Sequence, residues 1–273
     1  METEQTDFPA AQDVAEWLTK QHADSRRFEP FAAARGIRTM PDAYRVQDRF
    51  NALRSASRAV SRAGYKIGLT STAMQAMCGI DTPVAGVVFA DRVHASGAVL
   101  KPSAYGRFGI EFEIAVRIGR DLAPSDRSGQ PVTLAEVVAA IDGVAPAIEI
   151  VDDRGCDYKT LDMLSLVADN AWNAGIVVGT FQSSWPDLAS VEGSVITEDG
   201  SVLDTGRGAD VLGNPLLSVV WLAEHLAASG GSLRSGDIVM TGSMVTTKFP
   251  STSGRFRFEV SGLGSVEVQV DAG

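Results

Sequence analysis

The spacing of apolar residues divides the chain into a helical first part and a strand-rich second part. In the first part, apolar positions recur at the three- and four-residue intervals of one helix face, as at Val14, Trp17 and Leu18. The second part consists of short Val-, Ile- and Phe-rich stretches separated by Gly, Pro, Asp and Ser, which is typical of half-buried strands. We therefore expect an α+β protein with a helical part over residues 1–63 and a β domain over residues 64–273.

Strands are predicted wherever apolar residues alternate with polar ones, or form a short continuous run, between turn residues. No segment repeats at a fixed period, which argues against solenoid and propeller architectures. The predicted strands are 85–90, 96–100, 109–118, 145–151, 174–180, 191–197, 237–241, 255–260 and 264–270.

Helices within the β domain are marked by their start signals. Thr133 and Glu136 have the spacing of a capping box and open a predicted helix over 133–141. The segment 214–230 has a proline at its second position and a glycine at its end, which predicts another helix. The segment 159–170 fits a helix or an irregular structure equally well.

The charge balance limits the classes of partner. The net charge is −10 without a cluster of Lys or Arg, so we predict binding neither to nucleic acid nor to anionic membrane surfaces. The opening METEQTDFPA is polar, and no run approaches the ~18 apolar residues of a membrane span. We expect a cytoplasmic protein, in which Cys78 and Cys156 are buried free thiols because neither has a Cys or His at ligand spacing, with a disulfide between them as the alternative.

Two glutamates, Glu111 and Glu113, lie one residue apart within the predicted strand 109–118. Strand alternation places both on one face, with Cβ atoms about 7 Å apart, so they require water, an arginine or a metal ion between them. Glu149 stands alone in the apolar centre of another predicted strand. Three carboxylates could hold a divalent cation with positions left open for substrate, although glutamates on the wet face of an antiparallel strand are also common.

Lys66 lies between Tyr65 and Ile67, just before a Gly-Leu-Thr-Ser turn. Two interpretations are open. The side chain could run along an apolar surface to reach water, or it could be a cation held in a pocket to meet a carboxylate or move a proton.

A second turn follows the predicted strand 237–241, at Thr241, Gly242 and Ser243. Hydroxyls and free backbone N–H groups at a strand end suit anionic oxygens, although by itself the pattern is simply a turn. Asn170, next to Asp169, fits either a turn or a substrate contact.

Eight stretches of the sequence, which contain the residues discussed above, follow one another in an order that resembles the 2-oxopent-4-enoate (2-hydroxypentadienoate) hydratases. They also resemble the related 2-oxo-3-hexenedioate decarboxylases of the fumarylacetoacetate hydrolase superfamily. The resemblance runs from about residue 40 to the C-terminus. It implies a mixed β-roll with a small helical N-terminal part, assembly as a homo-oligomer, and association with a homologous hydratase or decarboxylase subunit. The blocks that carry it are MPDAYRVQDRF, GYKIGLTS, GIEFEIAVRIGRDL, PAIEIVDDR, VADNAWNAGIVVG, GRGADVLGNPLLSVVWLAEHL, LRSGDIVMTGS and GLGSVEVQV.

The resemblance also implies roles for particular residues. Glu111, Glu113 and Glu149 would bind Mg²⁺ or Mn²⁺, and Lys66 would line the active site. The other candidate site residues are Ser243 for catalysis, and Leu69, Thr70, Ser71, Asn170, Thr241 and Gly242 for substrate binding.

The implied reaction is hydration of a 2-hydroxy-2,4-dienoate. Proton transfer at C5, helped by Lys66, gives an α,β-unsaturated ketone, and addition of water at C4 gives a 4-hydroxy-2-oxo acid in bacterial aromatic meta-cleavage catabolism. The alternatives are decarboxylation of 2-oxo-3-hexenedioate (4-oxalocrotonate) at the same site, hydrolysis of an acylpyruvate, and a catalytically weak subunit that stabilises a homologous enzyme.

The chain departs from the hydratase pattern at two places. Val84 stands where hydratases often have an aspartate that could transfer a proton, and Asp91 is the substitute that we consider. The segment 243–254 is longer and more basic than expected, and Lys248 within it could meet a second carboxylate or another polar tail on the substrate. A solvated loop lysine is the alternative.

Overall fold

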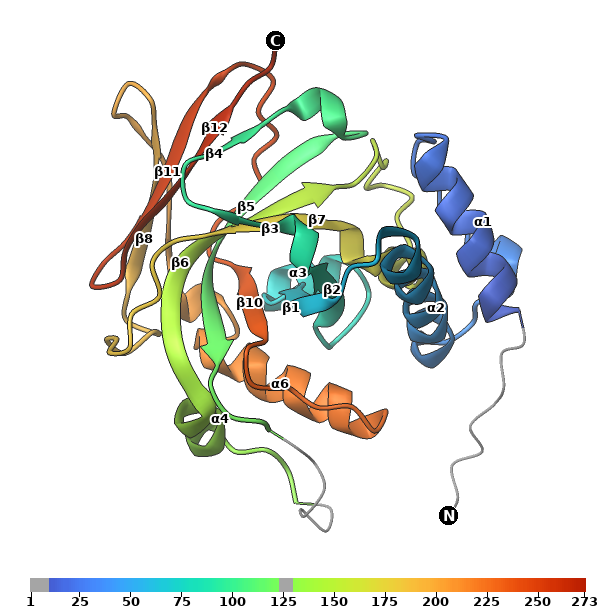
Figure 1. Ribbon diagram of the computed structural model, residues 1–273, viewed down its shortest axis with the longest axis horizontal. Coiled ribbons are helices and arrows are strands. Elements are labelled where there is room, and N and C mark those ends of the chain that lie inside the picture. The colour runs from blue at the N-terminus through green and yellow to red at the C-terminus, as the bar shows by residue number, and fades with distance from the viewer. Residues whose placement is uncertain (1–9, 123–129) are drawn as a thin grey trace.

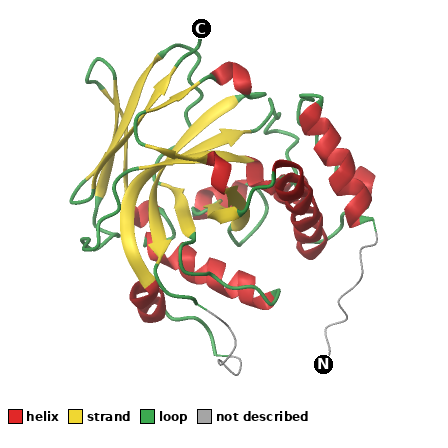
Figure 2. Cartoon of the chain, viewed as in Figure 1, coloured by secondary structure: helices red, strands yellow, loops and turns green. Residues whose placement is uncertain are grey.

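The computed structural model describes residues 10–122 and 130–273, which form two β-sheets flanked by helices (Figures 1 and 2). The strands are β1 (Arg62–Gly68), β2 (Val84–Phe89), β3 (Val93–Ala95), β4 (Ala98–Leu100), β5 (Phe108–Ile118), β6 (Ile141–Asp152), β7 (Asn173–Val178), β8 (Glu192–Thr197), β9 (Val202–Arg207), β10 (Ile238–Ser243), β11 (Gly254–Val260) and β12 (Gly264–Val270). The helices are α1 (Ala11–Ala23), α2 (Met40–Arg58), α3 (Thr72–Met77), α4 (Leu134–Ala140), α5 (Met163–Ala168) and α6 (Pro215–Ala228).

The larger sheet has seven strands in the order β2-β1-β10-β5-β6-β7-β3, and the smaller has five in the order β4-β12-β11-β8-β9. Each sheet mixes parallel pairs, such as β1 with β10 and β4 with β12, with antiparallel ones. The mixed sheets and the accompanying helices confirm the predicted α+β class. Figure 1 shows the smaller sheet on one side of the molecule and α1 and α2 on the other.

The strands β5 and β6 form the longest antiparallel pair, in one register from Phe108 opposite Asp152 to Arg117 opposite Gly143, after which the register shifts. Alternation along β5 sends Phe112 to the core between the sheets, where its ring centroid lies 5.5 Å from that of Phe258. The glutamates of β5 therefore point away from this core.

The helical N-terminal part packs on the opposite side of the larger sheet. The helix α2 begins with a capping box between Thr39 and Asp42, worth about 1 kcal/mol. Its buried Val46 and Phe50 join α1 and α5 in a second apolar cluster. The division at residues 63 and 64 stays a prediction, and the polar opening falls on residues 1–9, outside the described chain.

Each predicted strand segment contains a strand, whereas β1, β3 and β9 were not predicted. The pattern hid β1 because glycines and two cations interrupt its apolar run, and it hid β9 because most of its residues are exposed. The capping box at Thr133 and the proline start of α6 are both present. The ambiguous segment 159–170 contains the short helix α5.

The sequence analysis expected no run as long and apolar as a membrane span, but the helical segment Gly208–Ala228 is long and apolar enough to cross a membrane by length and composition alone. This segment contains α6. The residues Leu216, Val219 and Leu222 of α6 are buried in the main core, which accounts for the hydropathy of the helix.

Candidate active site

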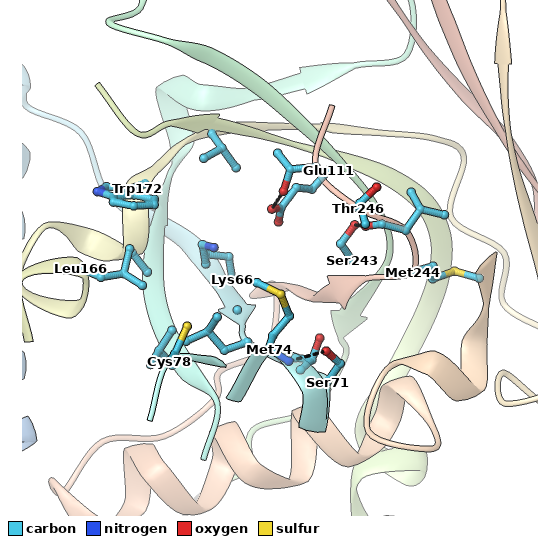
Figure 3. Close-up of a pocket in the computed structure, with 18 of the residues that line it drawn as sticks. Lys66, Ser71, Met74, Cys78, Glu111, Leu166, Trp172, Ser243, Met244 and Thr246 are labelled. Atoms are coloured by element: carbon cyan, nitrogen blue, oxygen red, sulfur yellow. Dashed lines mark hydrogen bonds between the residues drawn. The ribbon is translucent and has the colours of Figure 1, made fainter. Parts of the chain in front are cut away.

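A cavity of about 670 Å³ lies where β1, β5 and β10 meet the segments that connect them to the rest of the fold. Figure 3 shows Glu111, Ser243 and Thr246 on one side of it and Leu166 and Trp172 on the other. Lys66 lies between the two sides. The cavity therefore has one polar side and one apolar side.

The three predicted carboxylates gather at the polar side, where Glu111 lines the cavity and Glu113 and Glu149 lie buried close to it. Glu111 lies directly opposite Glu149 in the β5–β6 register, and Glu113 follows Glu111 on the same face. One oxygen from each of the three lies within 4.8 Å of the others. Glu113 and Glu149 are fully buried, and Glu111 is half-buried at the cavity wall.

Each carboxylate is held through one of its oxygens by a donor from a different segment. The backbone N–H of Gly242 donates to Oε2 of Glu113 at 2.8 Å, Asn173 donates to Oε1 of Glu149 at 2.9 Å, and Thr247 donates to Oε1 of Glu111 at 2.5 Å. These bonds fix the orientation of the carboxylates.

Two of the remaining oxygens, Oε1 of Glu113 and Oε2 of Glu149, are buried without a hydrogen-bond partner. A buried, unpaired carboxylate oxygen is costly. The three carboxylates converge, and two of them have an oxygen without a hydrogen-bond partner. This arrangement fits a hard divalent cation such as Mg²⁺ or Mn²⁺.

Lys66 is buried on β1, with Nζ 3.2 Å from Oε1 of Glu149. It is therefore a pocket cation and does not extend along an apolar surface to water. Burial alone would lower the pKa of Lys66, but Glu149, Glu111 and Glu113 outweigh this effect and the pKa lies above its ordinary value.

The pKa values of the buried carboxylates are raised because several negative charges lie close together away from water. Burial raises the pKa of Glu113 well above its ordinary value, and Glu149 and Glu111 add to the rise. Burial also raises the pKa of Glu149 to about 7, although Lys66 acts against the rise. One ammonium group thus leaves the cluster short of positive charge, which a divalent ion would supply.

Other predicted site residues also reach the cavity. Leu69, Thr70 and Ser71 line it just after β1, and Ser71 also caps α3 by accepting a hydrogen bond from the Met74 N–H. Ser243 lines it at the end of β10. Val84, the residue at the expected aspartate position, lines the cavity as well.

Thr241 and Gly242 form hydrogen bonds within the protein. The hydroxyl of Thr241 donates to the Ile114 carbonyl, and the Gly242 N–H is committed to Glu113. Gly242 has a φ of +110°, and a Cβ there would lie 2.2 Å from the hydroxyl oxygen of Thr70. Gly242 therefore orients a carboxylate and Thr241 ties β10 to β5, neither residue lines the cavity, and the substrate contacts expected of them stay predictions.

Two further predicted site residues, Asp91 and Lys248, form ion pairs within the protein. Asp91 does not line the cavity and forms an ion pair with Arg58 at 2.9 Å. Lys248 donates to Asp204 and to Thr246, two residues of the cavity wall, so its charge is already paired, and its contact with a substrate carboxylate stays a prediction.

Asn170 is also structural. Its side-chain oxygen accepts from the Val87 N–H at 2.7 Å and from Asn51 at 2.9 Å, and its amide donates to the Val87 carbonyl at 2.9 Å. It is fully buried and does not line the cavity. Asn170 therefore links its turn to β2, and the substrate contact expected of it stays a prediction.

The site residues that the sequence analysis missed lie close to residues that it named. Asn173 follows Asn170 by three positions, and its amide beside a lone glutamate was the available signal. Thr247 lies in the unusual segment after Ser243, but nothing in its spacing indicates a partner in β5. The missed residues are Asn173, Thr247 and Trp172.

The sequence of the chain can also be compared with those of known protein families. The family model of the fumarylacetoacetate hydrolase C-terminal region matches residues 63–271. The chain belongs to the fumarylacetoacetate hydrolase family, which confirms the resemblance seen in the sequence.

Relatives within this family carry two activities. The chain is 35% identical to the 2-keto-4-pentenoate hydratase of Burkholderia vietnamiensis strain G4 over 227 residues, which cover 82% of this chain and 83% of the relative. It is 33% identical to a 4-oxalocrotonate decarboxylase of Pseudomonas putida over 85% of each chain. The solved structure of 4-oxalocrotonate decarboxylase from Pseudomonas putida G7, complexed with magnesium and adipate, superposes with a TM-score of 0.87 and 31% identity, over 96% of this chain and 97% of that one.

Proposed function

We propose that the protein is a metal-dependent hydratase that adds water to a 2-hydroxy-2,4-dienoate to give a 4-hydroxy-2-oxo acid. The family, the hydratase relatives and the three convergent carboxylates support this reaction. Glu111, Glu113 and Glu149 would hold Mg²⁺ or Mn²⁺. When bound, the ion would supply Lewis-acid polarisation of the substrate's C2 oxygen.

Lys66 is the group placed to move a proton. Its Nζ lies beside Glu149 and faces the space between the carboxylates and the apolar side. The C2 hydroxyl gives up its proton and C5 receives one through Lys66, which leaves a C3=C4 double bond conjugated with the C2 ketone. Water then adds with its hydroxyl at C4 and its proton at C3.

The observation that favours hydration over decarboxylation is the charge of the cavity wall. Among the described lining residues Lys66 is the one Lys or Arg, and it is already paired with Glu149. Of the other carboxylates on the wall, Asp204 is paired with Lys248, and Asp210 would repel a second carboxylate. A dicarboxylate such as 4-oxalocrotonate would therefore have to compete with Asp204 or Glu149 for a cation at its far end, whereas a monocarboxylate does not require one.

The test is a paired assay on metal-stripped protein with Mn²⁺ added back. Loss of 2-hydroxypenta-2,4-dienoate is followed by ultraviolet absorbance, and CO₂ is trapped from 4-oxalocrotonate in parallel. We expect metal-restored loss of the dienoate without CO₂, abolished in Glu111→Gln. Release of CO₂ from the dicarboxylate at a higher kcat/KM would assign decarboxylation instead.

The oligomeric state and the cellular location of the protein are also predicted. A homo-oligomer, or association with a homologous subunit, stays a prediction. Light scattering of the purified protein would give the number of subunits. A cytoplasmic location stays a prediction, which fractionation of the source cells would test.

A further inference from the structure

The side of the cavity away from the carboxylates is a continuous apolar surface. Figure 3 shows Leu166, Trp172 and Cys78 across the cavity from Ser243 and Thr246. We call this surface the tail chamber, and it is defined by Cys78, Val84, Leu161, Met163, Leu166 and Trp172.

The chamber wall is part of the folded core. Val84, Leu166 and Trp172 are at most 7% exposed and belong to the apolar cluster that the N-terminal helices form with α5. The ring of Trp172 packs edge-on against Phe28 at a centroid distance of 5.1 Å. A wall built from core residues is preorganised, so a ligand would not have to order it on binding.

A strained turn presents this wall to the cavity. Asn170, Ala171 and Trp172 have φ values of 54°, 46° and 60°, which are left-handed conformations that cost side-chain-bearing residues about 1–2 kcal/mol each. The turn also fits against β2 only because residue 86 is glycine, since a Cβ there would lie 2.5 Å from the Asn170 carbonyl oxygen. The result is that Ala171 and Trp172 face the cavity while Asn173 reaches Glu149.

None of the six residues that define the tail chamber carries a charge that could bind a polar substrate tail. The nearby guanidinium of Arg107, which stacks on Phe249 and Tyr158 at the wall, is bound to Asp153 through its Nε and Nη2 atoms. Tyr158 also donates its hydroxyl proton to Asp153. The free surface of the chamber is therefore hydrocarbon, sulfur and indole.

We propose that the tail chamber binds an uncharged alkyl or aryl substituent carried by the substrate at C5 or beyond, so that the preferred substrates are dienoates longer than five carbons. The assignment of the reacting end rests on the proposed function. The cavity of about 670 Å³ falls within the ~300–1,000 Å³ typical of pockets that enclose drug-sized ligands, and is thus larger than a five-carbon acid requires. Occupying it with an apolar tail would remove apolar surface from water on both sides.

Binding can be tested apart from turnover with saturated 2-oxo acids, which carry the C1 carboxylate and C2 oxygen but cannot be hydrated. Calorimetry on Mn²⁺-loaded protein would compare pyruvate, 2-oxohexanoate, 2-oxooctanoate and 2-oxoadipate. We expect the affinity to rise about fourfold for each methylene that enters the chamber, and 2-oxoadipate to bind at least ~10-fold more weakly than 2-oxohexanoate. Equal affinity across the alkyl series would overturn the proposal.

Cys78 gives a second readout. It lies on the chamber wall and is partly exposed, whereas Cys156 is 3% exposed. In the Mn²⁺-loaded protein, 2-oxooctanoate should slow labelling of Cys78 by a maleimide several-fold more than pyruvate does at matched occupancy. Labelling that is equally slow, or equally fast, with the two acids would place the tail elsewhere.

A charge placed in the chamber should reverse the preference. Leu161→Arg puts a cation on the wall at a position that is already partly exposed, and Leu217→Arg makes the same change at an exposed position of α6 as the matched control. We expect Leu161→Arg to bind 2-oxoadipate at least ~10-fold better relative to 2-oxooctanoate, and the control to match the wild type. An unchanged ratio in a folded Leu161→Arg protein would contradict the proposal.

The hydratase reaction and the role of the tail chamber can be tested independently of each other. If 2-hydroxypenta-2,4-dienoate is hydrated but longer tails do not bind more tightly, the chamber assignment is wrong and the hydratase stands. If longer 2-oxo acids bind more tightly but no dienoate is hydrated, the reaction is wrong and the chamber stands.

Discussion

Lys66 and Glu149 form a buried ion pair in which Nζ lies 3.2 Å from Oε1. Asn173 donates to the same oxygen, so one side of the carboxylate is held by two donors while Oε2 has no partner. The pair joins β1 to β6 although the two strands are not neighbours in the sheet. It thereby fixes a cation and a ligand oxygen relative to each other.

Replacing Lys66 with methionine should remove proton transfer and leave ion binding intact. The side chain keeps its length but loses its charge, so kcat should fall about 10²–10⁴-fold. The Kd for Mn²⁺ should stay the same or decrease, because a positive charge beside the ligands is gone. Steady-state kinetics and titration with Mn²⁺ would check both, and loss of metal binding together with activity would contradict the assigned role.

Glu113→Gln should separate metal binding from folding. The carboxylate is fully buried with one oxygen unpartnered, so a neutral amide relieves a desolvated charge while it removes a ligand. Thermal unfolding should show that the metal-free variant is at least as stable as the wild type at neutral pH. Saturating Mn²⁺ should raise the Tm of the wild type and leave that of the variant almost unchanged. A similar rise in both would exclude Glu113 as a ligand.

Asn170→Ala should destabilise the protein by about 3 kcal/mol, because three buried hydrogen bonds are lost and the left-handed backbone remains. Asn170→Gly loses the same bonds but adopts φ > 0 freely, so it should be about 1 kcal/mol less destabilised than the alanine variant. Urea unfolding of both would measure the difference. Equal stabilities would show that backbone strain at this turn is negligible.

The pH dependence of stability should contain a contribution from Asp169, which is fully buried against His22 and Arg154 with Arg54 nearby. Burial alone would raise the pKa of Asp169, but the two cations outweigh it and the folded-state pKa lies below the ordinary 3.8. A lowered carboxyl pKa stabilises the fold above pH 3.8, and this contribution is lost as the pH falls through the folded-state pKa.

Asp169→Asn should therefore cost about 3 kcal/mol at neutral pH, because Arg154 stays buried without its partner. The gap between the variant and the wild type should narrow as the pH is lowered past 3.8. Urea unfolding across this range would measure the gap. A constant gap would show that the charge of Asp169 is not the stabilising feature.

The carboxylates could be predicted from the sequence because alternation along a strand is a local rule. Glu111 and Glu113 share a face through the period of two, and Glu149 stood out as a charge in an apolar run. Their donors could not be predicted in the same way. Thr247 reaches Glu111 only because the chain after β10 returns along β5, where Lys248 pairs with Ile110 through their backbones.

Residues chosen for their chemical type alone were less reliable. Asp91 and Lys248 were plausible as an acid and a cation, but ion pairs with Arg58 and Asp204 engage them. Such pairs join residues more than 30 positions apart, so they depend on tertiary structure that no local pattern encodes. Asn170 was also singled out, but its hydrogen-bond partners on β2 and α2 depend on the tertiary structure in the same way.

The two sides of the cavity come from different parts of the chain. The carboxylates belong to the central strands β5 and β6, whereas most of the tail chamber belongs to the segment 161–172, which packs on the N-terminal helices, and Cys78 and Val84 complete it. Mutations at Leu161 or Leu166 can therefore alter which molecule is accepted while the reacting groups stay in place. The turn at 170–172 limits this freedom, because it borders the chamber and precedes Asn173 directly. Natural variation in substrate range should accordingly accumulate before the turn, in residues 161–166, and spare the turn itself.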